Sequence, residues 1–142
     1  MAIKDVSLIS NVIGYGPEPL FYEEVEQCLT ISSTGEVCCR RFAYGDGGED
    51  NVMKNEERIS ISEEAANRIL AYIDKFFEEY EPIWATDVGK WHLEALFDDG
   101  SSKSTQGPMI GTEPVDGVDL SEMIREEVPI EGLFLFDGNL IF

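Results

Sequence analysis

The sequence predicts a single α+β domain over residues 1–142. We expect a mainly antiparallel sheet of about five to seven strands, packed on one long amphipathic helix, with a second short helix. Three observations lead to this prediction. Hydrophobic residues make up 43% of the chain, enough for a packed core despite the charge. Apolar residues recur at helical spacing over 63–80. Apolar and polar residues alternate over 91–98, directly before an Asp-Gly turn signal.

The first part of the chain predicts three strands, over 6–15, 24–32 and 36–44. The first strand should end at 16–19, where two prolines remove backbone donors. A tight turn at 33–36 makes the next two strands a hairpin. Glycine and acidic residues dominate 45–57, so this stretch is predicted to be a loop. Ile59 and Ile61 then suggest a short strand.

The longest helix is predicted over residues 63–80. Ser62 is a good N-cap, and Glu63 and Glu64 fall in the first turn, where the helix dipole favours anions. Pro82 should stop the helix. The apolar stripe expected to face the sheet consists of Ala65, Ala66, Ile69, Leu70, Ile73, Phe76, Phe77 and Tyr80.

A second hairpin follows. Trp91, Leu93 and Phe97 should share one face of a strand, whereas His92 falls on the less apolar face. The Asp-Gly pair at 99–100 should form a tight turn into a polar return strand, at an edge of the sheet.

The remaining residues predict a loop, a short helix and a last strand. Prolines and glycines mark the loop over 107–118. Asp119 or Ser121 should cap the second helix. Residues 132–142 are strongly apolar and should close the chain as a strand or strand pair.

Charge limits the functions open to this chain. With 29 Asp and Glu against 10 Lys and Arg, the formal net charge is -19. Such a chain is repelled by phosphate backbones and anionic lipids, so we expect no nucleic-acid and no membrane partner. A basic protein is the partner that the charge favours, although acidity also serves solubility or adaptation to high salt.

The cysteines and the N-terminus point to the cytoplasm. Cys28, Cys38 and Cys39 are odd in number and include an adjacent pair, which is unlike a secreted disulfide framework. We therefore expect three reduced thiols. The chain also begins without a basic stretch followed by a long apolar run, so no signal peptide is predicted.

No metal or cofactor is expected. Asp46, Glu49 and Asp50 are the candidate metal ligands, because Ca²⁺ prefers carboxylate oxygens, but their spacing does not fit an EF-hand. The glycines at 14–17 lack the pattern of a dinucleotide fingerprint or a P-loop.

The candidate catalytic residues are His92 and a cysteine. A lone histidine can act as general base toward a thiol nucleophile, and Cys28, Cys38 or Cys39 could approach it in space. No local signature surrounds these cysteines. Cysteine within a strand usually behaves as a small hydrophobe.

One stretch is similar to a known group. The helix from Ser62 to Tyr80 is followed by Gly89-Lys90-Trp91-His92-Leu93, by Asp99-Gly100 and by Gly107. This order resembles a loose group of small uncharacterised bacterial α+β proteins, in which a helix precedes a G-x-W-x-L…D-G strand pair. The resemblance covers about a third of the chain. It implies the helix-then-hairpin order and brings no activity, cofactor or catalytic residue.

The function favoured by these observations is a cytoplasmic, non-enzymatic domain that binds another protein through an acidic surface. One alternative is a small hydrolase or thiol enzyme that uses His92 and a cysteine. Another is an immunity-type inhibitor of a basic toxin. The expected partner-binding residues lie in two loops: Asp46, Glu49, Asp50, Glu113, Asp116 and Asp119.

Overall fold

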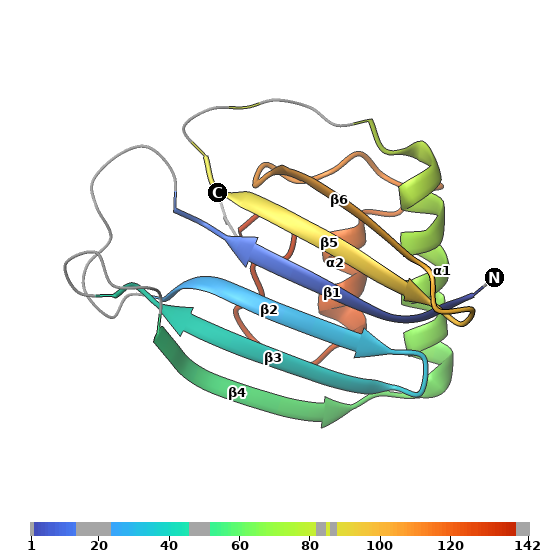
Figure 1. Ribbon diagram of the computed structural model, residues 1–142, viewed down its shortest axis with the longest axis horizontal. Helices are drawn as coiled ribbons and strands as arrows, with labels where there is room; N and C mark the ends of the chain where they lie inside the picture. The colour runs from blue at the N-terminus through green and yellow to red at the C-terminus, as the bar shows by residue number, and fades with distance from the viewer. Residues whose placement is uncertain (1, 14–23, 46–51, 82–84, 86–87, 139–142) are drawn as a thin grey trace.

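The computed structural model describes residues 2–13, 24–45, 52–81, 85 and 88–138. The protein is a single α+β domain with a six-stranded antiparallel sheet, a 17-residue helix and a second short helix (Figure 1). The elements, in chain order, are β1 (Ile3–Asn11), β2 (Glu24–Ser32), β3 (Glu36–Ala43), β4 (Val52–Ser60), α1 (Glu63–Glu79), β5 (Lys90–Phe97), β6 (Ser102–Pro108) and α2 (Leu120–Glu127).

The sheet has the strand order β4-β3-β2-β1-β5-β6, and each neighbouring pair is antiparallel. In the middle of the sheet, Leu8 of β1 lies opposite Leu29 of β2 and Leu93 of β5. Directly opposed residues share a face, so these three leucines point to the same side. The next residue along β1, Ile9, lies opposite Cys28 and His92 and points to the other side.

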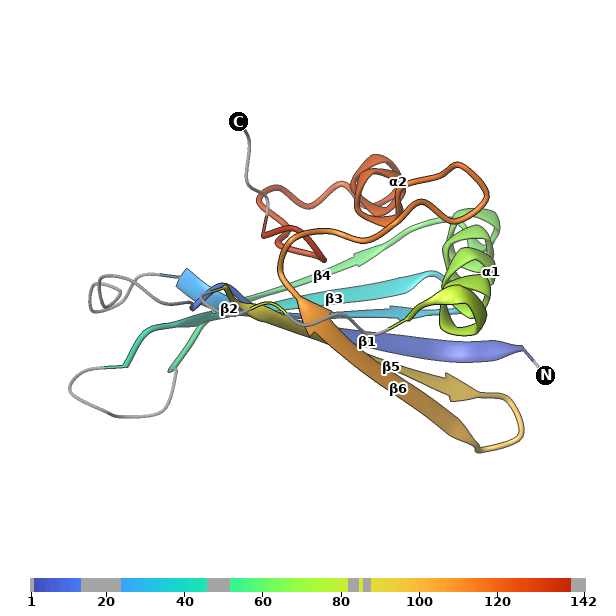
Figure 2. The same cartoon turned by 90° about the horizontal axis from the view of Figure 1, so that it is seen from above.

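Both helices lie on one side of the sheet (Figure 2). The other side, which we call the open face, is not covered by a helix among the described residues. Two turns use glycine in a left-handed conformation. At Gly35, with φ of 94°, an added Cβ would lie 2.2 Å from the carbonyl oxygen of Ile61. At Gly100, φ is 88°, as a tight hairpin turn requires.

The core lies between the sheet and the helix side. Ser62 caps α1 by accepting a hydrogen bond from the amide of Ala65 at 3.1 Å. Phe76 of α1 then packs against the rings of Trp91 and Phe136, at centroid distances of 5.8 and 5.7 Å. Buried side chains of α1 are Ala66, Ile69, Leu70, Ile73 and Phe76.

Residues 129–138 form no strand. They lie on the helix side of the sheet, and we call them the strap. Buried polar side chains of the sheet hold the strap in place by hydrogen bonds to its backbone. Gln27, 2% exposed, donates to the carbonyl of Gly132 at 2.7 Å and accepts from the amide of Phe134 at 2.8 Å. Ser10 donates to the carbonyl of Leu135 at 2.7 Å. These bonds satisfy backbone groups that no sheet ladder serves here.

The predicted fold class and element order are confirmed, with three corrections. Residues 45–57 were expected to be a loop, yet β4 begins at Val52. Its sequence lacks alternation because β4 is an edge strand with nearly all side chains exposed. The expected last strand is also wrong within the described residues, because the strap covers the sheet instead of extending it. Phe77 of the predicted stripe is only partly buried.

Candidate functional site

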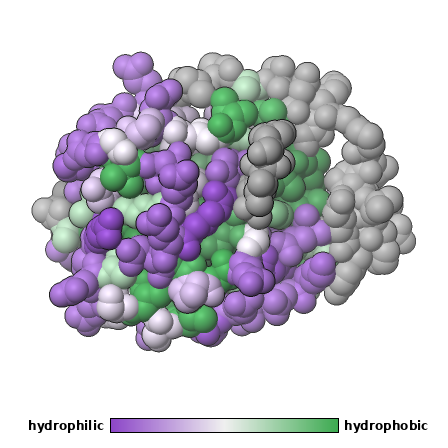
Figure 3. Space-filling view, turned by 180° about the vertical axis from the view of Figure 1, so that it is seen from behind, coloured by the Kyte–Doolittle hydropathy of each residue, from purple (hydrophilic) through white to green (hydrophobic). Residues whose placement is uncertain are grey.

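Charge is distributed unevenly between the strands of the sheet and the segments that pack on its helix side. The six strands carry seven acidic and seven basic residues. Residues 63–81 and 109–137, which we call the helix layer, carry 14 acidic and three basic residues. From behind the sheet, hydrophilic side chains dominate much of the helix layer, with hydrophobic ones between them (Figure 3). Of these two described layers, the helix layer is therefore the acidic one.

A groove of about 560 Å³ opens in the helix layer, between the C-terminal end of α1 and the segment 110–115. Its apolar lining includes an exposed aliphatic side chain, Ile110, at 55% exposure. Five carboxylates also line it, and no lysine or arginine does. The residues that line this carboxylate groove are Phe76, Glu79, Tyr80, Glu81, Ile110, Gly111, Thr112, Glu113, Pro114, Val115, Asp119 and Asp137.

The five carboxylates are not equivalent. Asp119 is the N-cap of α2, accepting from the amide of Glu122 at 3.1 Å. Asp137 accepts two hydrogen bonds from the guanidinium of Arg125, at 2.9 and 2.6 Å.

The other three, Glu79, Glu81 and Glu113, have no hydrogen-bond or ion-pair partner within the described part of the chain. They are the groove's available anions.

The loop residues expected to bind a partner thus have different roles. Glu113 lines the groove and is exposed. Asp116 forms an ion pair with Lys75 of α1, and the side-chain hydrogen bond raises the pKa of Lys75. Asp119 is occupied as a helix cap. Asp46, Glu49 and Asp50 lie outside the described residues.

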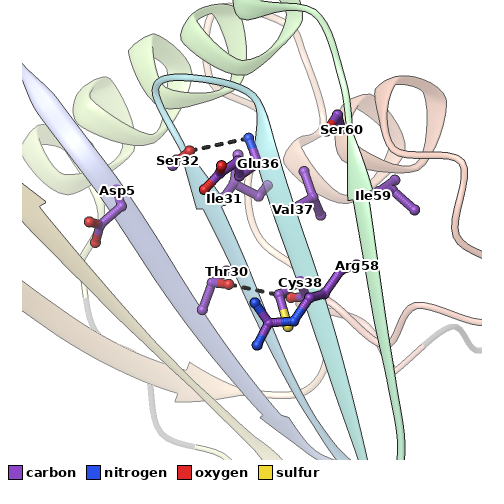
Figure 4. A pocket seen from close by; sticks show the side chains of 10 residues that line it. All are labelled: Asp5, Thr30, Ile31, Ser32, Glu36, Val37, Cys38, Arg58, Ile59 and Ser60. Carbon is purple, nitrogen blue, oxygen red and sulfur yellow. Dashed lines mark hydrogen bonds between the residues drawn. The ribbon is translucent and has the colours of Figure 1, made fainter.

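A second hollow, of about 710 Å³, lies on the open face over β1, β2, β3 and β4 (Figure 4). Four of the side chains that line it point to the open face: Asp5, Thr30, Cys38 and Arg58. Thr30 lies opposite Cys38, and Cys38 opposite Arg58, so the three form a row across the strands. This row carries no net excess of acid.

Glu56 pairs with the two arginines beside this hollow. It accepts from Arg40 at 2.8 Å and lies 3.5 Å from Arg58. The hydrogen bond from Arg40 is the main reason why the pKa of Glu56 is lowered. The thiol of Cys38 donates to the same carboxylate at 3.7 Å. Because these exposed groups neutralise one another, they form a solvated network on the sheet surface.

The candidate catalytic residues are divided between the two faces. Cys39 is 0% exposed on the core side, and burial raises the pKa of its thiol to about 11. Cys28, Cys38 and His92 share the open face. Strand β1 separates His92 from Cys28, which sets their Cα atoms about 10 Å apart.

The thiol of Cys28 contacts the hydroxyl of Ser7 at 3.7 Å. Within the described residues no hydrogen bond joins His92 to a cysteine, so this geometry does not assemble a thiol–imidazole pair. All three cysteines are unpaired, as predicted.

Metal and membrane features are absent from the described residues. No three His, Cys, Asp or Glu side chains there gather closely enough to hold a metal ion. No helix of that part combines the length and apolar composition needed to cross a membrane.

Comparison with known proteins gives no family: no protein-family model matches the chain, and no curated protein is similar enough to count as a relative.

The sequence interpretation missed most of the carboxylate groove. Glu79, Glu81 and Asp137 were not among the expected binding residues. One signal was present: the last turn of α1 contains no basic residue and holds Glu78 and Glu79. Acids at a helix C-terminus oppose the helix dipole, so this placement is unfavourable for the helix alone.

Proposed function

We propose that this protein is a non-enzymatic binding domain that engages a basic protein through its helix layer. The observation that carries the proposal is the charge segregation: 14 acidic against three basic residues in the helix layer, and seven against seven in the strands. Such a field attracts a cationic surface at long range and orients it toward one side of the domain. The helix layer also contains a groove with exposed apolar surface, where a partner can bury area.

An immunity-type inhibitor is a special case of this function. Its partner would be a basic toxin, such as a nuclease, whose nucleic-acid site is itself cationic. The acidic helix layer complements a surface of that kind. An inhibitor differs from other binding domains in its consequence, which is loss of the partner's activity at a one-to-one ratio.

The proposal is tested by capture with two matched sets of charge variants. One set neutralises Glu113, Asp116 and Glu131 of the helix layer to Gln or Asn. The control set neutralises Asp5, Glu26 and Glu94 on the sheet. We expect a basic protein to be retained by the unmodified domain and the sheet variant, and to be lost from the helix-layer variant and at high salt. Equal capture by both variants, or capture of acidic proteins only, would contradict the proposal.

The loop at Asp46, Glu49 and Asp50 is tested separately, because it lies outside the described residues. Changing these three acids to Asn or Gln removes as many charges as either set above. If this loop belongs to the interface, the association rate should fall together with its salt dependence. Unchanged association would exclude the loop and leave the helix layer as the binding surface.

A further inference from the structure

We infer that the carboxylate groove receives an arginine side chain from the basic partner. This inference rests on the proposed function and specifies the chemistry of its contact. The groove volume of about 560 Å³ is larger than one side chain needs, so a short segment that carries the arginine can enter with it.

The lining matches both parts of an arginine. The aliphatic stem can lie against apolar surface contributed by Tyr80, Ile110 and Pro114. Ile110 is 55% exposed, so its side chain offers apolar surface that a bound stem can cover. The guanidinium can then reach the carboxylates of Glu79, Glu81 and Glu113, which lack partners within the described residues.

The end of α1 adds to the cation preference. The last carbonyl groups of a helix lack N–H donors inside the helix and carry partial negative charge. Here Glu78 and Glu79 occupy that last turn without any basic residue. Negative charges gathered at a negative helix end raise the free energy of the unbound domain. A bound guanidinium relieves this repulsion, because it donates from a planar group to several acceptors at once.

One polar atom of a groove residue has an unused capacity for hydrogen bonding. The hydroxyl oxygen of Thr112 is buried and has no hydrogen-bond partner among the described residues. Thr112 belongs to the groove lining. A buried hydroxyl without a partner costs free energy, so this part of the lining is less stable than a fully hydrogen-bonded one.

A guanidinium is favoured over an ammonium group at this site. The available carboxylates come from two separate elements, Glu79 and Glu81 from the end of α1 and Glu113 from the 110–115 segment. A planar fork with five N–H donors can bridge both elements, whereas an ammonium is a compact point charge that is more strongly hydrated. We therefore expect arginine to bind better than lysine.

The test uses the whole protein and short peptides of the form Gly-Xaa-Gly, blocked at both ends, with arginine, lysine or citrulline at Xaa. Binding is followed through the backbone amide NMR signals of residues 76–81 and 110–113. We expect the arginine peptide to shift these signals and the citrulline peptide to bind about tenfold more weakly, because citrulline lacks the charge.

Two double variants locate the binding. Glu79→Gln with Glu113→Gln should weaken arginine binding about tenfold. Glu122→Gln with Glu126→Gln removes the same charge from α2 outside the groove and should leave binding nearly unchanged. All four side chains are exposed, and circular dichroism checks that the fold is kept.

The outcomes separate this inference from the proposed function. If both variants weaken binding equally, the peptide responds only to the overall negative charge of the helix layer. The groove is then not the arginine site, whereas the proposed binding of a basic protein through an acidic surface stands. Equal binding of lysine or citrulline overturns the choice of arginine. If no signal near the groove shifts, the inference is wrong whatever the capture experiment finds. Capture of no basic protein overturns the proposed function instead.

Discussion

The sheet and the helix layer of this domain carry charge differently. The strands hold seven acidic and seven basic residues, and opposite charges lie on neighbouring strands, as Arg40 and Glu56 do. The helix layer holds 14 acids and three bases, and each of those bases, Arg68, Lys75 and Arg125, already pairs with an acid of the same layer.

The difference bears on why the chain is so acidic. A solvated protein surface needs charge, but the sheet shows that balanced charge suffices on this fold. The helix layer alone contributes -11 of the formal -19, and its acids sit at unfavourable places such as the end of α1. This concentration of acid in the helix layer is what the proposed binding function requires, whereas charge that serves solubility alone needs no preferred side.

The largest expected effect concerns the contact that joins the two layers. Phe76→Ala should lower the free energy of unfolding by about 3–5 kcal/mol, because it empties a site packed among Trp91 and Phe136. Urea denaturation measures the change. Phe77→Ala is the matched control, since Phe77 is only partly buried and should cost clearly less. Equal losses would show that Phe76 is not the key contact between layers.

The next largest effect concerns the strap. Gln27→Ala should destabilise the protein by roughly 2–3 kcal/mol, since the Gly132 carbonyl and the Phe134 amide lose a buried partner. Hydrogen exchange should also accelerate over 132–136 before the central strands respond. Gln106→Ala, at an exposed side chain of β6, serves as control. Unchanged exchange over 132–136 would contradict the fastening role of Gln27.

The two faces of the sheet can be compared through their thiols. Burial raises the pKa of Cys39 from 9.0 to about 11, so the folded protein keeps a proton that the unfolded chain releases. The contribution of the protonated Cys39 thiol to the free energy of unfolding is complete below about pH 9. It is lost as pH rises toward 11, by up to roughly 2 kcal/mol. The Cys39→Ala variant should lose less stability between about pH 8 and 10.5 than the unmodified protein does. Cys38→Ala, on the open face, should keep the full decline; if it does not, Cys39 is not its source.

The smallest effect tests the charge contrast directly. Glu78→Gln removes an acid from the last turn of α1 and should stabilise the protein by about 0.3–1 kcal/mol at low salt. Glu94→Gln removes the same charge from β5 on the open face, where we expect little change. Thermal melting of both variants at low and high salt measures the difference. A stabilisation by Glu94→Gln that matches or exceeds that of Glu78→Gln would remove the distinction between the layers.

Local signals made much of the fold predictable. The stripe and the Ser62 cap define α1, and the Asp-Gly turn defines the β5–β6 hairpin, because each depends on neighbours in sequence. The face of His92 followed from alternation alone. β4 was missed because an edge strand with exposed side chains carries no hydrophobic pattern.

The carboxylate groove could not be predicted in full, for a related reason. It forms where the end of α1 meets residues 110–115, some thirty positions later in the chain. Of its acids, the loop composition indicated Glu113 and Asp119, but nothing local links Glu79 or Asp137 to them. The strap was likewise misread as a strand, because an apolar run does not reveal that its backbone will bond to side chains such as Gln27 and Ser10.

The strap has a consequence for how the chain acquires its structure. Ser10 bonds to Leu135 and Gln27 to Phe134 across 125 and 107 positions of sequence. During synthesis, the β1–β2 and β2–β3 hairpins can pair early, but the part of their helix-side surface around Ser10 and Gln27 stays uncovered until residues 132–136 have left the ribosome. Closing loops of this length costs entropy before the contacts repay it. The nascent domain therefore exposes apolar surface for most of its translation time, a period in which aggregation competes with folding and in which self-repulsion between its acidic copies keeps them apart.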